Sequence, residues 1–462
     1  MSEPLTRHTA SDASGSSLAG PKATRTVLFW TLPVVITLAV LGALASFYLG
    51  GILRPMTNLR HFPVAILNED AGPTGAQVVK GMLSGFDNDA YDVRLLNHDQ
   101  AKQQMDNAQI YGVAVIPPNF SSKLQAYAKS ALTPGRVERP TIIISTNPRA
   151  GALGASIAGQ TLQRAVAMVD HRVGERLTQE VAQQTGQKPE SGAAALLLAN
   201  PIEAKSTVHN ALPDGTGNGL SASYYSLLLL LAGFVGSLVI GMTVNSMLGL
   251  KTAAAIPVHQ SGEVGQISRF RALLIKWAMT VVLALLTSAG YMLIASKLGM
   301  PIQNGLSLWL FGVLVIAAVG ITSTSLIAAL GGIGVLVGLF VFVILGLPTA
   351  GETVPVEATP AFFGWLSKFD PMHQTFLGAR TLLYLDGRAD AGLSHSLVLT
   401  AIGLVVGILF GVIVTRLYDS RNGHRVPAAT PAPTAPAALS EPAAPTAAPK
   451  AAAAPVEIYP EP

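Results

Sequence analysis

The sequence contains no cysteine and few charged residues. Charged residues make up 12% of its 462 residues, whereas soluble globular domains average roughly 25%. Without thiols the chain forms no disulfide, iron–sulfur cluster, thiolate zinc site or cysteine nucleophile. The shortage of charge disfavours a soluble enzyme, and a net charge of +4 from scattered basic residues gives no footprint for nucleic acid. With 50% hydrophobic residues, the composition indicates the lipid bilayer as the partner.

Standard motifs for nucleotide binding and hydrolysis are also missing. The sequence has no G-x-x-x-x-G-K-[ST] phosphate loop, no H-E-x-x-H and no G-x-S-x-G. No Asp, Glu, Lys or Arg falls in the middle of an apolar window, where proton- or voltage-coupled transporters usually carry one. We therefore predict no catalytic, cofactor-binding or metal site and no enzyme activity. Energy for any transport would come from another chain.

Several apolar windows are long enough to cross a bilayer, which takes about 20 helical residues. Leu298–Gly351 carries no charge and is long enough for two spans, with Gly331-Gly332 as the turn. The first window follows a polar tail and exceeds the roughly 7 to 15 residues of a signal-peptide core, which favours an uncleaved anchor. The six predicted spans are Thr26–Leu53, Tyr225–Leu250, Trp277–Ser296, Leu306–Leu326, Val335–Leu347 and Ala391–Thr415.

Basic residues cluster beside the ends of these spans. The clusters precede the first span, separate the second from the third and follow the sixth: Arg7, Lys22 and Arg25; Lys251, Arg269, Arg271 and Lys276; Arg416, Arg421 and Arg425. Six spans place all three clusters on one side, which the positive-inside rule assigns to the cytoplasm. We predict a multi-pass protein of the cell membrane with both termini cytoplasmic and the long polar segment after the first span outside.

That polar segment shows alternating strand and helix patterns. Short apolar runs bounded by turn residues predict strands at Phe62–Leu67, Gly112–Ile116 and Thr141–Ile144. Helical stretches lie between them, and apolar residues recur every three to five positions from Leu153 to Val181, as in a long amphipathic helix. Such alternation is typical of a mostly parallel or mixed sheet covered by helices.

The predicted fold class is a polytopic α-helical membrane protein with six transmembrane helices and an extracytoplasmic α/β domain inserted between helices 1 and 2. The parts are a flexible cytoplasmic tail (1–25), the first transmembrane helix (26–53), the α/β domain (54–219), a membrane domain with helices 2–6 (220–425) and a disordered Ala/Pro-rich cytoplasmic tail (426–462).

Two polar groups outside the spans have alternative interpretations. Asn68-Glu69-Asp70 follows the first predicted strand, and it forms either a strand-to-helix turn, which is favoured, or a cation or headgroup site. The loop between the second and third spans forms either a docking surface for an ATPase or a solvated interfacial loop. The candidate coupling residues in that loop are His259, Glu263, Arg269 and Arg271.

Glycines repeat at four-residue spacing in the sixth predicted span. Gly403, Gly407 and Gly411 share one helix face, and small residues let helix backbones approach closely in a membrane. We predict packing within one subunit, with dimerisation as the alternative.

Four segments resemble the YhgE/Pip-like (DUF3533-related) membrane proteins of the ABC-2-type permease superfamily. They are FPVAILNEDAG (Phe62–Gly72), IYGVAVIPPNFSSKL (Ile110–Leu124), the stretch Gly331–Leu366 and FDPMHQTFLGARTLLY (Phe369–Tyr384). The resemblance implies an outer re-entrant segment near 349–385. It also implies a permease that dimerises and works with a separately encoded ATP-binding subunit to export a hydrophobic or amphipathic compound. The alternative is a non-transporting membrane scaffold, secretion accessory protein or surface receptor that presents the external domain.

Overall fold

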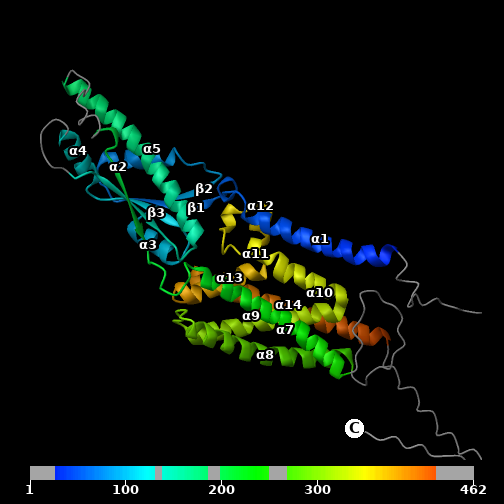
Figure 1. The fold of residues 1–462 in the computed structure, drawn as a ribbon. Helices are drawn as coiled ribbons and strands as arrows, with labels where there is room; N and C mark the ends of the chain where they lie inside the picture. The colour runs from blue at the N-terminus through cyan, green and yellow to red at the C-terminus, as the bar shows by residue number, and fades with distance from the viewer. Residues whose placement is uncertain (1–26, 131–137, 186–197, 249–267, 423–462) are drawn as a thin grey trace, which may run out of the picture. The chain divides into compact units, whose positions relative to one another are not determined.

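The computed structural model describes residues 27–130, 138–185, 198–248 and 268–422 (Figure 1). The chain divides into two compact units, Met1–Arg421 and Asn422–Pro462, and everything described below lies in the first, except the last residue of the final helix. The two tails predicted at 1–25 and 426–462 fall outside the described residues.

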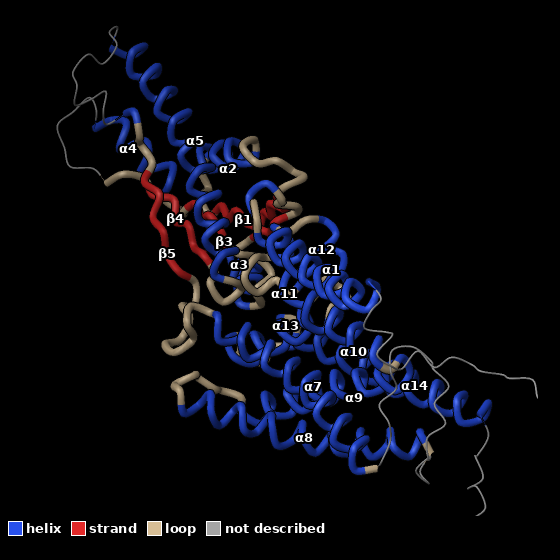
Figure 2. The backbone as a smooth tube through the Cα atoms, turned by 45° about the vertical axis from the view of Figure 1, so that its right-hand side comes forward, coloured by secondary structure: helices blue, strands red, loops and turns tan. Residues whose placement is uncertain are grey.

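A five-stranded mixed sheet forms the core of the α/β segment, residues 62–208 (Figure 2). The strand order is β2-β1-β3-β4-β5, with β3 and β4 antiparallel and the other neighbours parallel. This confirms the mixed sheet that the strand and helix alternation predicts. The strands are β1 (Phe62–Asn68), β2 (Tyr91–Leu96), β3 (Gly112–Ile116), β4 (Thr141–Thr146) and β5 (Glu203–Val208).

Helices cover both faces of this sheet. Side chains alternate between the faces of a strand, so Val64 and Ile66 of β1 share one apolar cluster with α2, α4 and α5, while Ala65 and Leu67 share another with α3. The covering helices are α2 (Pro73–Leu83), α3 (His98–Asp106), α4 (Phe120–Ser130) and α5 (Ala152–Thr185).

Within the described ranges, six helices are long and apolar enough to cross a membrane, which confirms the predicted number. The fifth is composite: α10 (Gly332–Leu339) continues through a π-helical turn, η3 (Phe340–Ile344), into α11 (Gly346–Thr349). It follows α9 at Gly331, where φ is 60°, a backbone conformation that favours glycine. The remaining five are α1 (Val27–Ile52), α7 (Leu220–Met247), α8 (Arg269–Lys297), α9 (Gly305–Leu330) and α14 (Leu393–Asn422).

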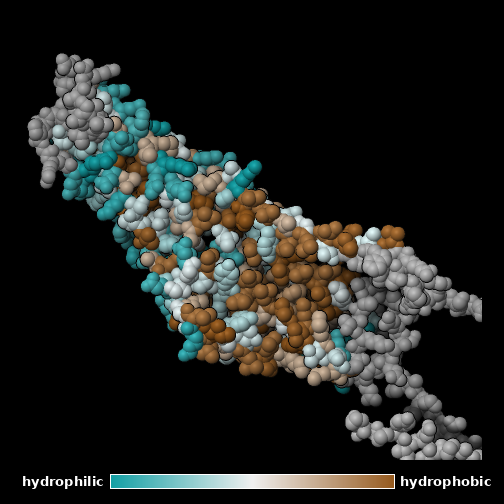
Figure 3. Space-filling view, in the orientation of Figure 1, coloured by the Kyte–Doolittle hydropathy of each residue, from teal (hydrophilic) through white to brown (hydrophobic). Residues whose placement is uncertain are grey.

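The six helices differ in how much protein surrounds them. In α9 56% of the apolar window is buried, against 6% in α1 and 11% in α14. A helix that is apolar all round yet exposed requires an apolar solvent. Figure 3 shows hydrophobic residues concentrated over the spanning helices, whereas hydrophilic residues are more frequent over the α/β segment. We conclude that α9 is the central helix and that α1 and α14 are the most exposed of the six.

Short helices join the fifth span to the sixth. They are η4 (Val356–Ala358), α12 (Ala361–Leu366), α13 (Pro371–Tyr384) and η5 (Ala389–Ala391). The hydroxyl of Tyr384 accepts a hydrogen bond from the Ala222 amide in the first turn of α7, and Gly378 lies against the Phe311 ring of α9. The segment therefore packs on the helix ends nearest the sheet. Whether it re-enters the bilayer stays a prediction.

Candidate functional site

The described part of the predicted coupling loop begins at the N-terminus of α8. His259 and Glu263 belong to residues 249–267 and lie outside the described residues. Arg269 and Arg271 are exposed in the first helical turn, where the Ser268 hydroxyl caps the helix by accepting a hydrogen bond from the Arg271 amide at 3.2 Å.

This end of α8 meets the C-terminal end of α14. The Arg269 guanidinium lies 3.8 Å from the centroid of the Tyr418 ring, and that of Arg416 lies 4.9 Å from the Phe270 centroid. Two of the basic clusters named from the sequence thus lie at one end of the helices. Arg269 holds α8 against α14, whereas the Arg271 side chain makes no ion pair or ring contact with the described residues.

The three glycines of α14 lie in different surroundings. Gly407 and Gly411 are buried, and a Cβ at Gly407 would collide with Thr322 of α9. A Cβ at Gly411 would lie 2.5 Å from the Ser325 hydroxyl. Gly403 is exposed, and a Cβ there would meet no described atom within 4 Å. The absence of a side chain therefore matters for the α9 contact at Gly407 and Gly411, whereas Gly403 contacts α9 through its carbonyl, which accepts a hydrogen bond from the Thr322 hydroxyl at 3.5 Å.

At the opposite end, the α/β segment is tied to the helices by long-range hydrogen bonds. The Arg60 amide donates to the Glu357 carbonyl at 2.8 Å, and Arg149 Nη1 donates to the Tyr384 carbonyl at 2.9 Å. Val354 and Ala358 belong to the apolar cluster of the sheet. The loop between the fifth and sixth spans is thus part of the α/β core, and we call this contact region the junction.

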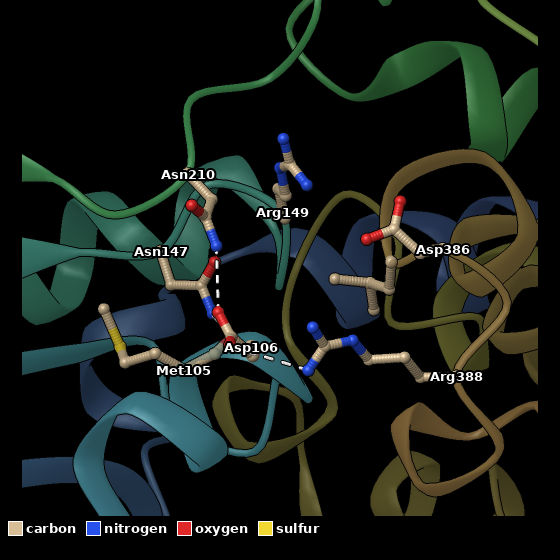
Figure 4. A pocket seen from close by; sticks show the side chains of 8 residues that line it. Met105, Asp106, Asn147, Arg149, Asn210, Asp386 and Arg388 are labelled. Atoms are coloured by element: carbon tan, nitrogen blue, oxygen red, sulfur yellow. Dashed lines mark hydrogen bonds and ion pairs between the residues drawn. The ribbon is translucent and has the colours of Figure 1, made fainter. Parts of the chain in front are cut away.

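A polar cluster around Asp106 forms one side of the junction (Figure 4). Asp106 accepts a hydrogen bond from Asn210 Nδ2 at 2.9 Å, lies 2.8 Å from His209 Nε2 and pairs with Arg388 Nη1 at 3.5 Å. Burial alone would raise the pKa of Asp106, but hydrogen bonds from His209 and Lys102 and their charges outweigh it and lower the pKa. The cluster encloses a cavity of only about 20 Å³, so it serves as a contact between the two parts.

A larger pocket of about 420 Å³, the junction pocket, lies between the beginning of β1, the residues before β3 and helix α13. Tyr111 lines it and donates its hydroxyl proton to Glu357 Oε2 at 3.2 Å. Arg380 of α13 is 9% exposed and donates from Nη1 to the Ala150 carbonyl at 2.7 Å. The apolar lining includes Phe376. The pocket therefore combines a buried cation with apolar walls.

Burial shifts the pKa of two further residues that line the junction pocket, Glu357 and His373. It raises the pKa of Glu357, although hydrogen bonds and the Arg380 charge oppose it, and it lowers the pKa of His373 to about 4. His373 Nδ1 lies 2.8 Å from the Ala350 carbonyl, which as an acceptor requires the proton on Nδ1. Near neutral pH the histidine is therefore uncharged.

None of the junction-pocket residues was singled out as functional from the sequence. Arg380 contacts a carbonyl 230 positions away, and Tyr111 contacts a carboxylate 246 positions away. No local pattern reveals such pairs. The available signal was the helical spacing of Arg380 with Phe376 and Tyr384, which places an arginine on an apolar helix face.

The Asn68-Glu69-Asp70 group has the geometry of a turn. Asp70 Oδ2 accepts hydrogen bonds from the Gly75 amide of α2 at 3.1 Å and the Ser121 hydroxyl of α4 at 2.5 Å, and Oδ1 accepts from the Ser121 amide. Its carboxylate is thus used in joining α2 to α4. Among the described residues no group of three or more His, Asp or Glu side chains is placed to hold a metal ion.

The sequence was compared with known families and proteins. The model of one family, described as ABC-2 family transporter protein, matches residues 25–413. That range includes the whole α/β segment, the first five spans and most of α14. No curated protein and no solved structure shows a significant match to the chain.

Proposed function

The chain belongs to the ABC-2 transporter family, and from this premise we propose that it is the permease subunit of an exporter driven by a separately encoded ATPase. Family membership carries the proposal, and the six apolar helices support it. Within the family we propose the YhgE/Pip-like branch, a cell-membrane location, a homodimer, and a cargo that is hydrophobic or amphipathic.

We propose that the end of α8 that bears Arg269 and Arg271 faces the cytoplasm. Arg416 of α14 lies at the same end, so positive charge from two chain segments gathers there. The positive-inside rule favours the cytoplasm for short basic flanks of this kind. The α/β segment, at the other end of the helices, is then outside, and both termini are inside.

The proposed ATPase contact is the first turn of α8 with the loop before it. Arg271 is exposed there, and His259 and Glu263 are the proposed partners in the loop. This turn contacts α14 through Arg269 and the Tyr418 ring, and α8 packs against α9, so a displacement of the turn would also move these two helices. The contact could therefore transmit ATPase motion to the central helix.

Untargeted mass spectrometry of extracts from the medium and from the cells tests this proposal for a cargo of any identity. Deleting the gene should remove at least one hydrophobic or amphipathic compound from the medium and raise it inside the cell, and the wild-type gene should reverse both changes. Arg271→Glu should lower export while still inserting into the membrane, because it reverses an exposed charge at the proposed contact and so weakens association with the ATPase.

The matched control is Lys297→Glu, the same reversal at the exposed opposite end of α8, which should export normally. Identical extracts from all strains would contradict export and favour a scaffold that presents the α/β segment. Normal export by Arg271→Glu would contradict the coupling role.

A further inference from the structure

The junction pocket contains a buried arginine that forms no ion pair with any carboxylate of the described residues. Arg380 is 9% exposed, its Nε atom has no hydrogen-bond partner, and it forms no ion pair within the described part of the chain. Its one hydrogen bond goes to the neutral Ala150 carbonyl. A buried charge without a counter-charge is costly, so an anion in the pocket would be stabilised.

The other titratable groups named in the lining of the junction pocket form no ion pair with Arg380. Arg94 is paired with Asp92 at 2.8 Å. Glu357 is the one carboxylate in the described lining, and it accepts a hydrogen bond from the Tyr111 hydroxyl and forms no ion pair with Arg380. Burial raises its pKa, although the Arg380 charge opposes this shift. His373 is uncharged near neutral pH. Among the arginines of the described lining, Arg380 is therefore the one without an ion-pair partner.

The junction pocket also lies beside surfaces suited to lipid. Its walls include Phe376 and Leu377 of α13. The adjoining segment exposes Phe362, Trp365 and Phe369 by 52%, 58% and 67%. Aromatic residues concentrate where a membrane meets water. The Phe362 ring also lies 6.3 Å from the Phe47 ring of α1, between centroids, so this segment adjoins a spanning helix.

We propose that the junction pocket binds the anionic group, a phosphate or carboxylate, of an amphipathic molecule. Arg380 binds the anion, and Phe376 and Leu377 contact the beginning of its apolar chain. The volume of about 420 Å³ lies within the roughly 300–1,000 Å³ of small-molecule sites. The molecule is either a lipid of the surrounding leaflet or an exported amphiphile. The site requires neither ATPase nor export, so its failure would leave the proposed function standing.

Calorimetric titration of the full chain in phosphatidylcholine nanodiscs tests the site. The probes are octyl phosphate, its uncharged counterpart octyl glucoside, and inorganic phosphate. We expect octyl phosphate to bind at least tenfold more tightly than either of the others, because only it offers both the anion and the chain. Equally tight binding of octyl glucoside would overturn the proposal that the site recognises an anion. Equally tight binding of inorganic phosphate would overturn the proposal that the site also binds an apolar chain.

Two variants locate the binding. Arg380→Gln should lower the affinity for octyl phosphate by about ten- to a hundredfold, which is the loss typical of removing a hydrogen bond to a charged group. Gln109→Trp, at an exposed position that lines the pocket, should also weaken it at least tenfold while leaving Arg380 intact, which guards against misfolding of the first variant. Arg164→Gln on the exposed face of α5 is the matched control and should bind normally.

Wild-type affinity in both Arg380→Gln and Gln109→Trp would overturn the proposal. Nanodiscs containing phosphatidylglycerol distinguish the two sources of the ligand. If this anionic lipid competes with octyl phosphate, the ligand is a resident lipid; if the affinity is unchanged, it is an amphiphile that arrives from elsewhere.

Discussion

Asp370 is a helix cap that has lost most of its contact with water. Its carboxylate accepts a hydrogen bond from the His373 amide at 3.0 Å at the start of α13, and the residue is 4% exposed. Carboxylates at helix N-termini are usually stabilised by the helix dipole. Here burial outweighs that effect and the hydrogen bonds, and it raises the pKa of Asp370 to about 7. The charged form of this cap is therefore disfavoured in the folded protein.

This raised pKa predicts a pH-dependent stability. The folded protein holds the Asp370 proton more tightly than the unfolded chain, so its contribution to the free energy of unfolding is full below about pH 4 and is lost as the pH rises through about 7. Asp370→Asn keeps the cap and cannot ionise. We expect the free energy of unfolding of this variant, minus that of wild type, to be about 1 kcal/mol larger at pH 8 than at pH 6.

Unfolding midpoints of the purified proteins at pH 6 and pH 8 provide the measurement. Burial lowers the pKa of His373 to about 4, so its contribution to the free energy of unfolding changes in the opposite direction and is lost as the pH falls. Because it is present in both proteins, it cancels in the difference between them. The same difference at both pH values would show that Asp370 does not titrate in this range.

Among the elements, the strands at the centre of the sheet were predictable and those at its edges were not. β1 is buried along nearly its whole length, so its sequence FPVAILN reads as an apolar run. β2 and β5 are the two edge strands. β5, with the sequence EAKSTV, is almost entirely exposed. An edge strand that buries little needs no apolar pattern, and its position is set by backbone pairing with its neighbour.

The packing of α14 on α9 yields a prediction with an internal control. Gly407→Ala introduces a Cβ that collides with Thr322, and overpacking of this kind costs about 1–3 kcal/mol. Gly403→Ala meets no described atom within 4 Å and should leave stability unchanged or raise it by up to about 1 kcal/mol, since alanine favours helix. Thermal unfolding in detergent compares the two. Equal loss of stability in both would contradict the arrangement of α14.

A larger side chain at Gly403 tests the alternative role of this helix. Leucine there projects from an exposed position without entering the α9 contact. If α14 forms a subunit contact through Gly403, cross-linked dimer should decrease in Gly403→Leu, while unfolding stays at the wild-type temperature. Unchanged cross-linking would leave packing within one subunit as the role of the glycines.

At the scale of the whole molecule, the junction joins parts that are far apart in sequence. Arg149 reaches Tyr384, Arg380 reaches Ala150, and Ala358 packs in the core of the sheet. Hydropathy and charge predict the number of spans because each spanning helix must by itself be apolar over the thickness of the bilayer. They say nothing of these contacts, which depend on single side chains from distant segments. The α/β segment and α13 can separate only by breaking the buried hydrogen bond from Arg380 to Ala150 and the half-buried one from Arg149 to Tyr384.

The absence of cysteine makes the topology directly testable, because every cysteine introduced is the only thiol in the chain. Six spans return the chain to its starting side, so sites at opposite ends of the helices must differ in access. Arg164→Cys on α5 and Lys297→Cys at the end of α8 should react with a membrane-impermeant maleimide in intact cells. Arg271→Cys and Ser420→Cys should react only after permeabilisation. All four positions are exposed, so a lack of reaction in intact cells reports the membrane barrier.

Because one helix separates Arg271 from Lys297, labelling of both in intact cells would mean that α8 does not cross the membrane. Labelling of Arg271→Cys and Ser420→Cys in intact cells, without the other two, would mean that the orientation is reversed and that the proposed ATPase contact lies on the wrong side.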